Sequence, residues 1–455
     1  MSKISGLRKL HFVGAGGISM SALAKLMLMM GKEVSGSDLV YNEEMCILNQ
    51  WGAEIWVGHD PDKAEKAELI VYSLAVPSTD PELVRARERG IACVSRPHFL
   101  SEVTKDYAVI VAVAGTHGKT TATSIIANIF NEAGKAFSAH IGGNANGLGN
   151  MVYKGYDYFI TEACEYKKSF IGLVADVAVV LNAEIDHPDT YSTVDALYDA
   201  FDEFLQNIKK GGAAVVSGES EYFRRLNSGN AKVISYGLEG DLTYLIENIR
   251  EQKNGFYSFQ ITQNGMLKAD ISLKVPGYHN IYNATAAYAV CEQLKLDRTD
   301  IIKGIESFAG VERRFEEKGK IKGARIFVDY AHHPSEIRAA IATALSMRPK
   351  RLLIVFQPHT YSRTKRLFDE FTTCLSGGTE LYLFKEYAAR ELPLQGASAY
   401  NLYTAIRNTG VNAYYYGNLL PLAEAVASSV RDGDIVLILG AGDIVMLADI
   451  LKEIH

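Results

Sequence analysis

The stretch Val109-Ile-Val-Ala-Val-Ala114 runs directly into Gly115-Thr-His-Gly-Lys-Thr-Thr121, and helix-forming residues follow from Ala122 to Glu132. A short apolar run rich in β-branched residues predicts a buried strand. A glycine-containing loop between such a strand and a helix directs backbone N–H groups and the positive helix end toward one point, where an anion is stabilised. The stretch therefore predicts an α/β domain with a phosphate-binding loop.

This loop is a shortened form of the phosphate-binding pattern G-x-x-x-x-G-K-[ST], because Val113 stands at the first glycine position. In such loops the lysine contacts the β- and γ-phosphates and the following hydroxyl reaches Mg²⁺. Lys119 and Thr120 are the candidates for these roles. The alternative is a glycine-rich turn with an incidental lysine, which the strand–loop–helix context disfavours.

Two further strands enter glycine-containing turns. Leu10–Val13 precedes Gly14-Ala-Gly-Gly17, and Asp434–Leu439 precedes Gly440-Ala-Gly442. Strand-like and helix-like stretches alternate throughout, as in α/β proteins with parallel sheets. At 455 residues, the chain is expected to form three domains, with boundaries near residues 105 and 310. We expect domains at 1–105, 106–310 and 311–455.

Composition excludes several classes of protein. The net charge is -6 without long charged runs, which argues against nucleic-acid binding. The five cysteines are widely spaced and lack a C-x-x-C pair, which disfavours a disulfide framework or zinc site and indicates a reducing compartment. No apolar stretch approaches the ~20 residues needed to span a bilayer. The expected location is the cytoplasm, without membrane insertion.

Acidic and imidazole side chains follow two further predicted strands. Glu162 ends the strand that begins at Tyr158, with Glu165 nearby, and His187 follows the strand Val177–Leu181. Ligands of open α/β sheets bind beyond the carboxyl ends of the strands. Mg²⁺ favours oxygen ligands, so a carboxylate suits it better than a histidine does. A loop histidine that caps a helix is the alternative for His187.

The first turn, Gly14-Ala-Gly-Gly-Ile-Ser-Met20, resembles a dinucleotide-binding fingerprint, but Ser19 stands in place of the third glycine. Asp38 ends the next predicted strand, about where a ribose-binding carboxylate belongs. The pattern favours a nucleotide, and a nicotinamide-dependent dehydrogenase is one alternative that it raises. An ordinary tight turn is the other.

Polar clusters occupy three later segments: Pro276–Asn283, Asp329–Pro334 and Ile354–Lys365. The asparagines of the first segment are also typical helix caps. Arg363 in the third segment suits a carboxylate or a phosphate, and a solvated basic loop is the alternative.

Taken in order, these motifs resemble the Mur ligase family, and most closely its alanine-adding members, over nearly the whole chain. The matching segments are Val13–Met20, Gly36–Asp38, Gly115–Thr121, Glu162–Glu165, Asn182–Tyr191, Gly277–Asn280 with Asn283, Arg313–Phe315, Asp329–Pro334 and Gln357–Thr364.

The resemblance implies a Rossmann-like first domain that binds a UDP-sugar, a central P-loop ATPase-type domain with a mostly parallel sheet, and a Rossmann-like third domain that binds the amino acid. It also implies ATP-dependent ligation of L-alanine to the lactyl carboxylate of UDP-N-acetylmuramate through an acyl phosphate, in peptidoglycan precursor synthesis. ATP and Mg²⁺ would be required, and a homodimer is compatible with this reading.

The resemblance assigns roles by position. The UDP-sugar would contact Gly14, Gly16, Gly17, Asp38 and Ser73. ATP would contact Gly115, Thr116, His117, Gly118, Lys119, Thr120 and Thr121, with His279, Asn280 and Asn283 near adenine and Arg314 and Asp329 on the nucleotide. Thr120 would serve one Mg²⁺ ion, and Glu162 and His187 would hold a second. Lys119, Glu162 and His187 would be catalytic. The amino-acid end would be lined by Tyr330, His332 and Arg363.

Departures from the family pattern leave questions open. Ser19 replaces a common glycine, Cys164 and Tyr166 stand where Asp and Ser are frequent, and Thr360 stands where many alanine-adding members carry Arg. Glu162 is preferred to Glu165 as the metal ligand on its spacing. The rivals are a ligase that recycles a tripeptide onto the same UDP-sugar, a glutamate-adding ligase, and a nucleotide-binding protein without catalysis.

Overall fold

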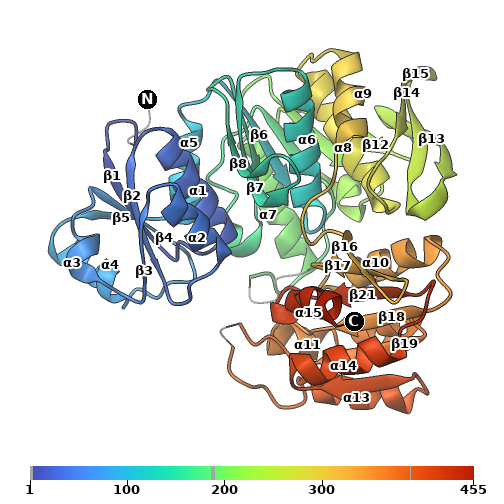
Figure 1. The fold of residues 1–455 in the computed structure, drawn as a ribbon. Coiled ribbons are helices and arrows are strands. Elements are labelled where there is room, and N and C mark those ends of the chain that lie inside the picture. The colour runs from blue at the N-terminus through green and yellow to red at the C-terminus, as the bar shows by residue number, and fades with distance from the viewer. Residues whose placement is uncertain (1–3, 186–189, 390, 455) are drawn as a thin grey trace. The chain divides into compact units, whose positions relative to one another are not determined.

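The chain has the expected three-domain α/β architecture, seen in a computed structural model that describes residues 4–185, 190–389 and 391–454. Within these residues the strands form three sheets. The chain divides into two compact units. The first comprises 1–247, 260–270 and 282–309, and the second comprises 248–259, 271–281 and 310–455. Figure 1 follows the sheets from blue at the N-terminus to red at the C-terminus.

The N-terminal sheet is parallel, with the strand order β3-β2-β1-β4-β5. Its register sets Val13, Ser37, Tyr72 and Ser95 level with one another, so the loops that follow these strands leave the sheet along one edge. Its elements are β1 (Lys9–Val13), α1 (Ile18–Met29), β2 (Glu33–Asp38), α2 (Glu43–Gln50), β3 (Glu54–Val57), α3 (Pro61–Ala64), β4 (Leu69–Tyr72), α4 (Pro81–Glu88), β5 (Ala92–Ser95) and α5 (Arg96–Thr104).

The central sheet has the order β15-β14-β13-β12-β11-β10-β6-β9-β7-β8. The predicted strand β6 lies between β10 and β9, and its residues from Ile110 onward are buried, as expected for a parallel strand covered on both faces. The elements are β6 (Val109–Ala114), α6 (Lys119–Glu132), β7 (Phe137–Ala145), β8 (Gly149–Tyr153), β9 (Tyr158–Glu162), β10 (Val177–Val180), α7 (Val194–Gln206), β11 (Ala213–Ser217), β12 (Lys232–Gly237), β13 (Tyr244–Glu251), β14 (Tyr257–Gln263), β15 (Met266–Ser272), α8 (His279–Gln293) and α9 (Arg298–Ser307).

The C-terminal sheet has the order β16-β17-β21-β18-β19-β20, parallel except for β16. The third glycine-containing turn follows β21, between the strands that carry the other polar motifs of this domain. The elements are β16 (Glu316–Ile321), β17 (Ala324–Asp329), α10 (Pro334–Ser346), β18 (Leu352–Phe356), α11 (Tyr361–Arg366), α12 (Phe368–Cys374), β19 (Glu380–Phe384), α13 (Ala399–Asn408), β20 (Ala413–Tyr416), α14 (Leu419–Ser429), β21 (Ile435–Leu439) and α15 (Leu447–Glu453).

Several helices begin at a capping side chain, whereas two helices begin at a glycine. Side-chain oxygens cap α4, α7 and α13 through Asp80, Thr193 and Ser398. In contrast, α1 and α6 begin after Gly17 and Gly118, which have no side chain to offer. The first-turn N–H groups of these two helices are therefore open to an anionic ligand.

Within the first unit, the N-terminal and central sheets are joined through α1 by a buried polar cluster. Lys25 Nζ donates to Glu44 Oε2 at 2.8 Å and to Asn150 Oδ1 at 2.9 Å, and all three residues are buried. Ser21 Oγ donates to the same Glu44 oxygen at 2.7 Å. Because each buried polar group has a partner, the cluster fixes α1 against β8 without a large desolvation cost.

In the described part of the chain, no helix is both long enough and apolar enough to cross a membrane.

A second buried carboxylate organises the N-terminal sheet. Glu82 in α4 accepts hydrogen bonds from Ser37 Oγ at 2.5 Å, Asp60 N at 2.9 Å and Trp56 Nε1 at 3.0 Å, and its Oε2 lies 3.4 Å from His11 Nε2. Burial would raise the pKa of Glu82, but the contacts with His11, Asp60 and Ser37 outweigh burial and lower it to about 2.

Substitution of Glu82 by Gln should destabilise the N-terminal domain at pH 7 by about 1–3 kcal/mol, because a charged acceptor is lost from four donors. The two tryptophans, Trp51 and Trp56, both lie in this domain, so denaturant unfolding followed by their fluorescence reports it selectively. The exposed Glu54→Gln is the matched control.

The Glu82→Gln difference should depend on pH. A lowered pKa contributes stability above the unfolded value of 4.5, and this contribution is lost as pH falls toward 2. The difference between wild type and variant should therefore shrink across this window. A difference that stayed constant from pH 7 to pH 3 would contradict the ionic account of Glu82.

Candidate functional site

The loop between β6 and α6 is held by the segment that follows the neighbouring strand β10. His117 N donates to Asn182 Oδ1 at 2.8 Å, and Asn182 Nδ2 returns a hydrogen bond to the His117 carbonyl at 3.1 Å. Thr116 Oγ1 donates to the Glu184 carbonyl at 2.8 Å and accepts from Glu184 N at 2.9 Å. These reciprocal bonds set the loop before any ligand arrives.

Two glycines of the loop are required by its geometry. Gly115 has φ +138°, and a Cβ there would lie 3.0 Å from the Cβ of Leu181. Gly118 has φ +81°, and a Cβ there would lie 2.6 Å from Asn283 Oδ1 in α8. The predicted residue Asn283 is therefore beside the phosphate loop, in close contact with Gly118.

Lys119 begins α6 and its ammonium group folds back over the loop. Its Nζ donates to the carbonyls of Gly115 at 2.5 Å and Thr116 at 2.9 Å, and pairs with Glu165 Oε2 at 3.0 Å. Burial alone would lower the pKa of Lys119, but the negative charge of Glu165 outweighs burial and raises it. The group is thus a fixed positive charge at the N-terminus of a helix.

The two candidate carboxylates have different partners. Glu165 is almost fully buried and pairs with Lys119, whereas Glu162 Oε1 accepts from Gly142 N at 2.6 Å. A Cβ at Gly142 would lie 2.6 Å from both Glu162 carboxylate oxygens, so only glycine leaves room for this carboxylate. His187, the third predicted metal ligand, lies outside the described residues.

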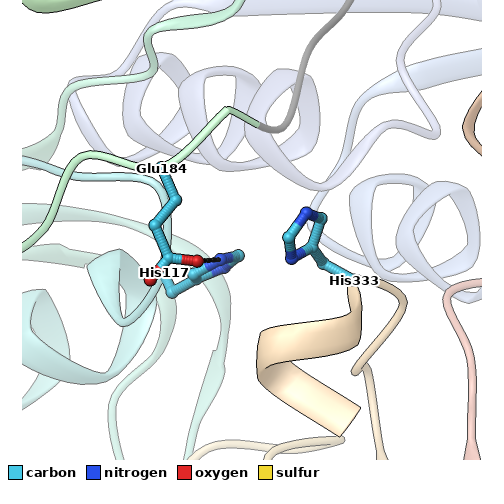
Figure 2. Close-up of side chains that lie close together, drawn as sticks. All are labelled: His117, Glu184 and His333. Atoms are coloured by element: carbon cyan, nitrogen blue, oxygen red, sulfur yellow. Dashed lines mark ion pairs between the residues drawn. The ribbon is translucent and has the colours of Figure 1, made fainter. Parts of the chain in front are cut away.

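Other predicted loop residues lie close to this point. Thr120 and Thr121 are buried in the first turn of α6. His117 Nε2 lies 3.6 Å from Glu184 Oε2, an ion pair when the imidazole is protonated, and Figure 2 shows the two side chains together. Oxygen donors from Thr120 and Glu162 are of the type that Mg²⁺ prefers.

The N-terminal glycine turn is held by the acidic residue predicted to face a ribose. Asp38 Oδ2 accepts from Gly16 N at 3.0 Å, and Asn42 Nδ2 donates to the Gly16 carbonyl at 2.9 Å. Gly14 has φ +85°, and a Cβ there would lie 3.1 Å from the Cβ of Ser73. The register therefore places the predicted residues that follow β1 and β4, and Asp38 at the end of β2, at one edge of the sheet. Gly17, the N-cap of α1, lies at the same edge.

In the second unit, Asp329 organises the start of the polar segment after β17. Its carboxylate accepts from Phe315 N and Ala331 N, each at 2.7 Å. Burial raises the pKa of Asp329 to about 6, although the Arg314 cation partly opposes this rise. His279, the first residue of α8, is exposed. Arg314 also lies over the Tyr330 ring at 5.2 Å.

The residues predicted for the amino-acid end meet around His359, which the sequence analysis did not assign. Arg363 Nη1 lies 3.1 Å from His359 Nδ1, and the His359 ring is 5.7 Å from that of His332. The Tyr330 ring lies 5.3 Å from the His332 ring, and the Tyr387 ring stacks on the His359 ring at 5.6 Å.

Asn280 from the predicted adenine cluster has a local role at the start of α8. Its Nδ2 donates to the Pro276 carbonyl at 2.7 Å, a bond that ties the start of α8 to the preceding segment and is not a helix cap. His333, next to His332, is the N-cap of α10 and forms a capping box with Glu336.

Contacts that complete these sites were not evident from the sequence. Asn182 and Gly142 were given no role, and they act through partners 65 and 20 residues away. For Asn182, its place at the start of the matching segment Asn182–Tyr191 was a signal; Gly142 lies in no matching segment.

Comparison with known proteins assigns a family to each of the three domains. Residues 9–108 match the description "Mur ligase family, catalytic domain", residues 113–291 match "Mur ligase middle domain", and residues 313–442 match "Mur ligase, glutamate ligase domain".

Similar proteins cover almost the whole chain. A UDP-N-acetylmuramate–L-alanine ligase from Clostridium beijerinckii is 38% identical over 97% of both chains, and one from Clostridium acetobutylicum is 39% identical over 97% of both. The structure of a UDP-N-acetylmuramate-alanine ligase from Thermotoga maritima matches with a TM-score of 0.84 and 28% identity over 98% of both chains. A murein peptide ligase from Psychrobacter arcticus shares the fold, with a TM-score of 0.73 and 21% identity.

Substitution of Gly142 by Ala should displace the Glu162 carboxylate and lower the affinity for Mg²⁺-ATP about 10-fold, as expected when a ligand's supporting contact is lost. Affinity for ATP without Mg²⁺ should not change. Calorimetric titration with and without the metal measures both quantities.

The control for this prediction is Gly172→Ala, because a Cβ there meets only Ser101 at 3.7 Å. Equal losses of affinity with and without Mg²⁺ would show that the Gly142 substitution disturbs the phosphate loop and not a metal ligand.

Proposed function

This chain belongs to the Mur ligase family, and we propose that it is the member that joins L-alanine to the lactyl carboxylate of UDP-N-acetylmuramate. It is an ATP-dependent enzyme that forms amide bonds. The observation that carries the substrate assignment is its 38–39% identity, over 97% of its length, to the two clostridial L-alanine ligases.

The three domains would divide the substrates among them. Residues 1–105 would bind the UDP-sugar, residues 106–310 ATP, and residues 311–455 L-alanine. The open N-termini of α1 and α6 support the first two assignments, because each offers backbone N–H groups to a phosphate chain. The cluster of Tyr330, His332 and Arg363 supports the third, because it combines a cation for the amino-acid carboxylate with apolar ring surface.

The reaction would proceed in two steps. A carboxylate oxygen of the sugar attacks the γ-phosphorus, ADP leaves, and an acyl phosphate forms. The neutral amine of L-alanine then attacks the acyl carbon, phosphate leaves, and the nitrogen loses a proton. The first step brings two anions together, so neutralisation of charge is the main requirement.

Lys119 would meet this requirement at the phosphate loop. Its ammonium group already lies on the loop carbonyls, and an incoming phosphate would replace Glu165 as its anionic partner. Thr120 at one site, and Glu162 with His187 at a second, would hold Mg²⁺, which would supply positive charge to neutralise the phosphates. The acyl phosphate must be kept from water, so turnover is expected to require domain closure.

The alternatives differ in what they predict. A tripeptide-recycling ligase would share the first two domains and differ at the amino-acid end. A nucleotide-binding protein without catalysis would bind ATP but release no phosphate with any acceptor. The proposed reaction places the chain in the cytoplasm, where it would act on small molecules. A homodimer remains a prediction that gel filtration with light scattering would test.

Substitution of Lys119 by Ala should lower kcat at least 100-fold, because one preorganised positive charge at the transferred phosphate is lost. Phosphate release under saturating substrates measures this effect. The exposed Lys135→Ala, beyond the end of the same helix, is the control and should keep wild-type turnover. Near-normal turnover of the Lys119 variant would refute the role of the loop.

Acceptor choice can be tested directly with Mg²⁺-ATP and UDP-N-acetylmuramate. Phosphate release is expected with L-alanine, with a product that gains the mass of one alanyl residue, and not with the tripeptide or without an acceptor. Release with the tripeptide alone would move the function to the recycling ligase. An absence of release with every acceptor would favour a non-catalytic role.

A further inference from the structure

Arg96 is a cation at the edge where the predicted UDP-sugar residues gather. It is the first residue of α5 and follows β5 directly. Because Val13, Tyr72 and Ser95 are level in the parallel sheet, the residues that follow them leave at one edge. None of Gly14, Asp38 and Ser73 carries a positive charge. Arg96 therefore adds a basic side chain to the edge of the sheet where these residues lie.

A directed chain of hydrogen bonds holds the Arg96 side chain. Arg96 Nη1 donates to Ser19 Oγ at 3.2 Å, and Ser19 Oγ lies 2.8 Å from His140 Nε2. His140 Nδ1 lies 3.0 Å from Thr161 Oγ1, which donates to the Glu162 carbonyl. Because Thr161 gives its hydrogen to the Glu162 carbonyl, it accepts from Nδ1 of His140, which therefore carries the ring proton and leaves Nε2 to accept from the Ser19 hydroxyl.

Each side chain in this series of hydrogen bonds has a partner, but the positive charge of Arg96 is not neutralised by an anion bonded to it. Burial and the nearby Arg96 cation lower the pKa of His140 to about 3, so the ring is neutral. Among the described residues, Arg96 hydrogen-bonds a hydroxyl and forms no ion pair. Burial lowers its pKa, an effect that Cys164 and Glu162 only partly offset. A partly buried cation without a bonded anion is destabilising, and a bound anion would relieve this cost.

We infer that Arg96 binds an oxyanion of the UDP-sugar substrate, namely its diphosphate, an inference that rests on the proposed function. The position of Ser19 supports the diphosphate, because this residue lies in the first turn of α1, whose N-terminus is open to phosphate. A planar guanidinium suits phosphate through paired N–H groups. Ser19, which stands where the family pattern commonly has glycine, then orients the Arg96 side chain through its hydrogen bond.

Binding of UDP and of UDP-N-acetylmuramate to the full chain, measured by calorimetry without ATP or alanine, tests the inference. Arg96→Ala should weaken the binding of both ligands by about 10- to 100-fold, as expected when a charge-assisted hydrogen bond is lost. Arg96→Lys should retain part of the affinity, and Ser19→Ala should lose about 3- to 10-fold because Arg96 loses its anchor.

The matched control is Arg89→Ala, which removes a surface arginine paired with Glu65 and should leave both affinities unchanged. Tryptophan fluorescence during unfolding checks that each variant keeps its N-terminal domain folded. If Arg96→Ala does not fold, the comparison of Arg96→Lys and Ser19→Ala with wild type decides the question.

The outcomes separate the two ligand groups. A loss confined to UDP-N-acetylmuramate would overturn the diphosphate contact and place Arg96 on the sugar's carboxylate. Unchanged affinity for both ligands, in folded variants, would overturn the inference altogether. Failure of the wild-type chain to bind UDP at all would refute the proposed function, and with it this inference.

Discussion

The reciprocal hydrogen bonds between the loop after β6 and the segment after β10 are the constraint on which the central domain depends. Asn182 bonds both the N–H and the carbonyl of His117, and Thr116 does the same to the backbone of Glu184. Because β6 and β10 are neighbours in a buried parallel sheet, these bonds cannot shift without moving the sheet. A loop held in this way can present its amides and Lys119 to a phosphate chain with little reorganisation.

Buried polar groups also connect the N-terminal domain to the central domain, and both domains belong to the first compact unit. Lys25, Glu44 and Asn150 form a buried cluster beneath α1, and the chain from Arg96 to Thr161 forms a second connection near its N-terminus. Polar contacts of this kind favour a single position of the first domain against the central domain. If the two domains shifted, buried polar groups would lose their hydrogen-bond partners. Two substrates bound on these domains would then meet in a defined geometry.

Much of this architecture could be predicted from local patterns. The apolar strand Val109–Ala114 and the glycine turns were recognisable because their signals lie within a dozen residues. The helix α6 begins at Lys119, three residues before the predicted start, because the last residues of the loop motif already form its first turn. The three sheets followed from the alternation of strands and helices.

The features of the site that could not be predicted from the sequence depend on contacts between segments that are distant in the chain. Glu162 and Glu165 could be ranked only by spacing, whereas their partners, Gly142 and Lys119, come from elsewhere in the sheet. Asn182 begins a segment that matches the family pattern, but its role becomes apparent only when the sheet brings it beside His117. Ser19 appeared only as a departure from a glycine pattern, and its partners Arg96 and His140 are 77 and 121 residues away.

The neutral state of His140 has a consequence for how the first two domains respond to their surroundings. Histidines at domain contacts commonly act as acid sensors, because their charge changes near neutral pH. With a pKa lowered by burial to about 3, His140 stays neutral throughout the physiological range. The contact that it mediates therefore does not respond to changes of pH within the physiological range, and the hydrogen bonds along it are preserved across that range.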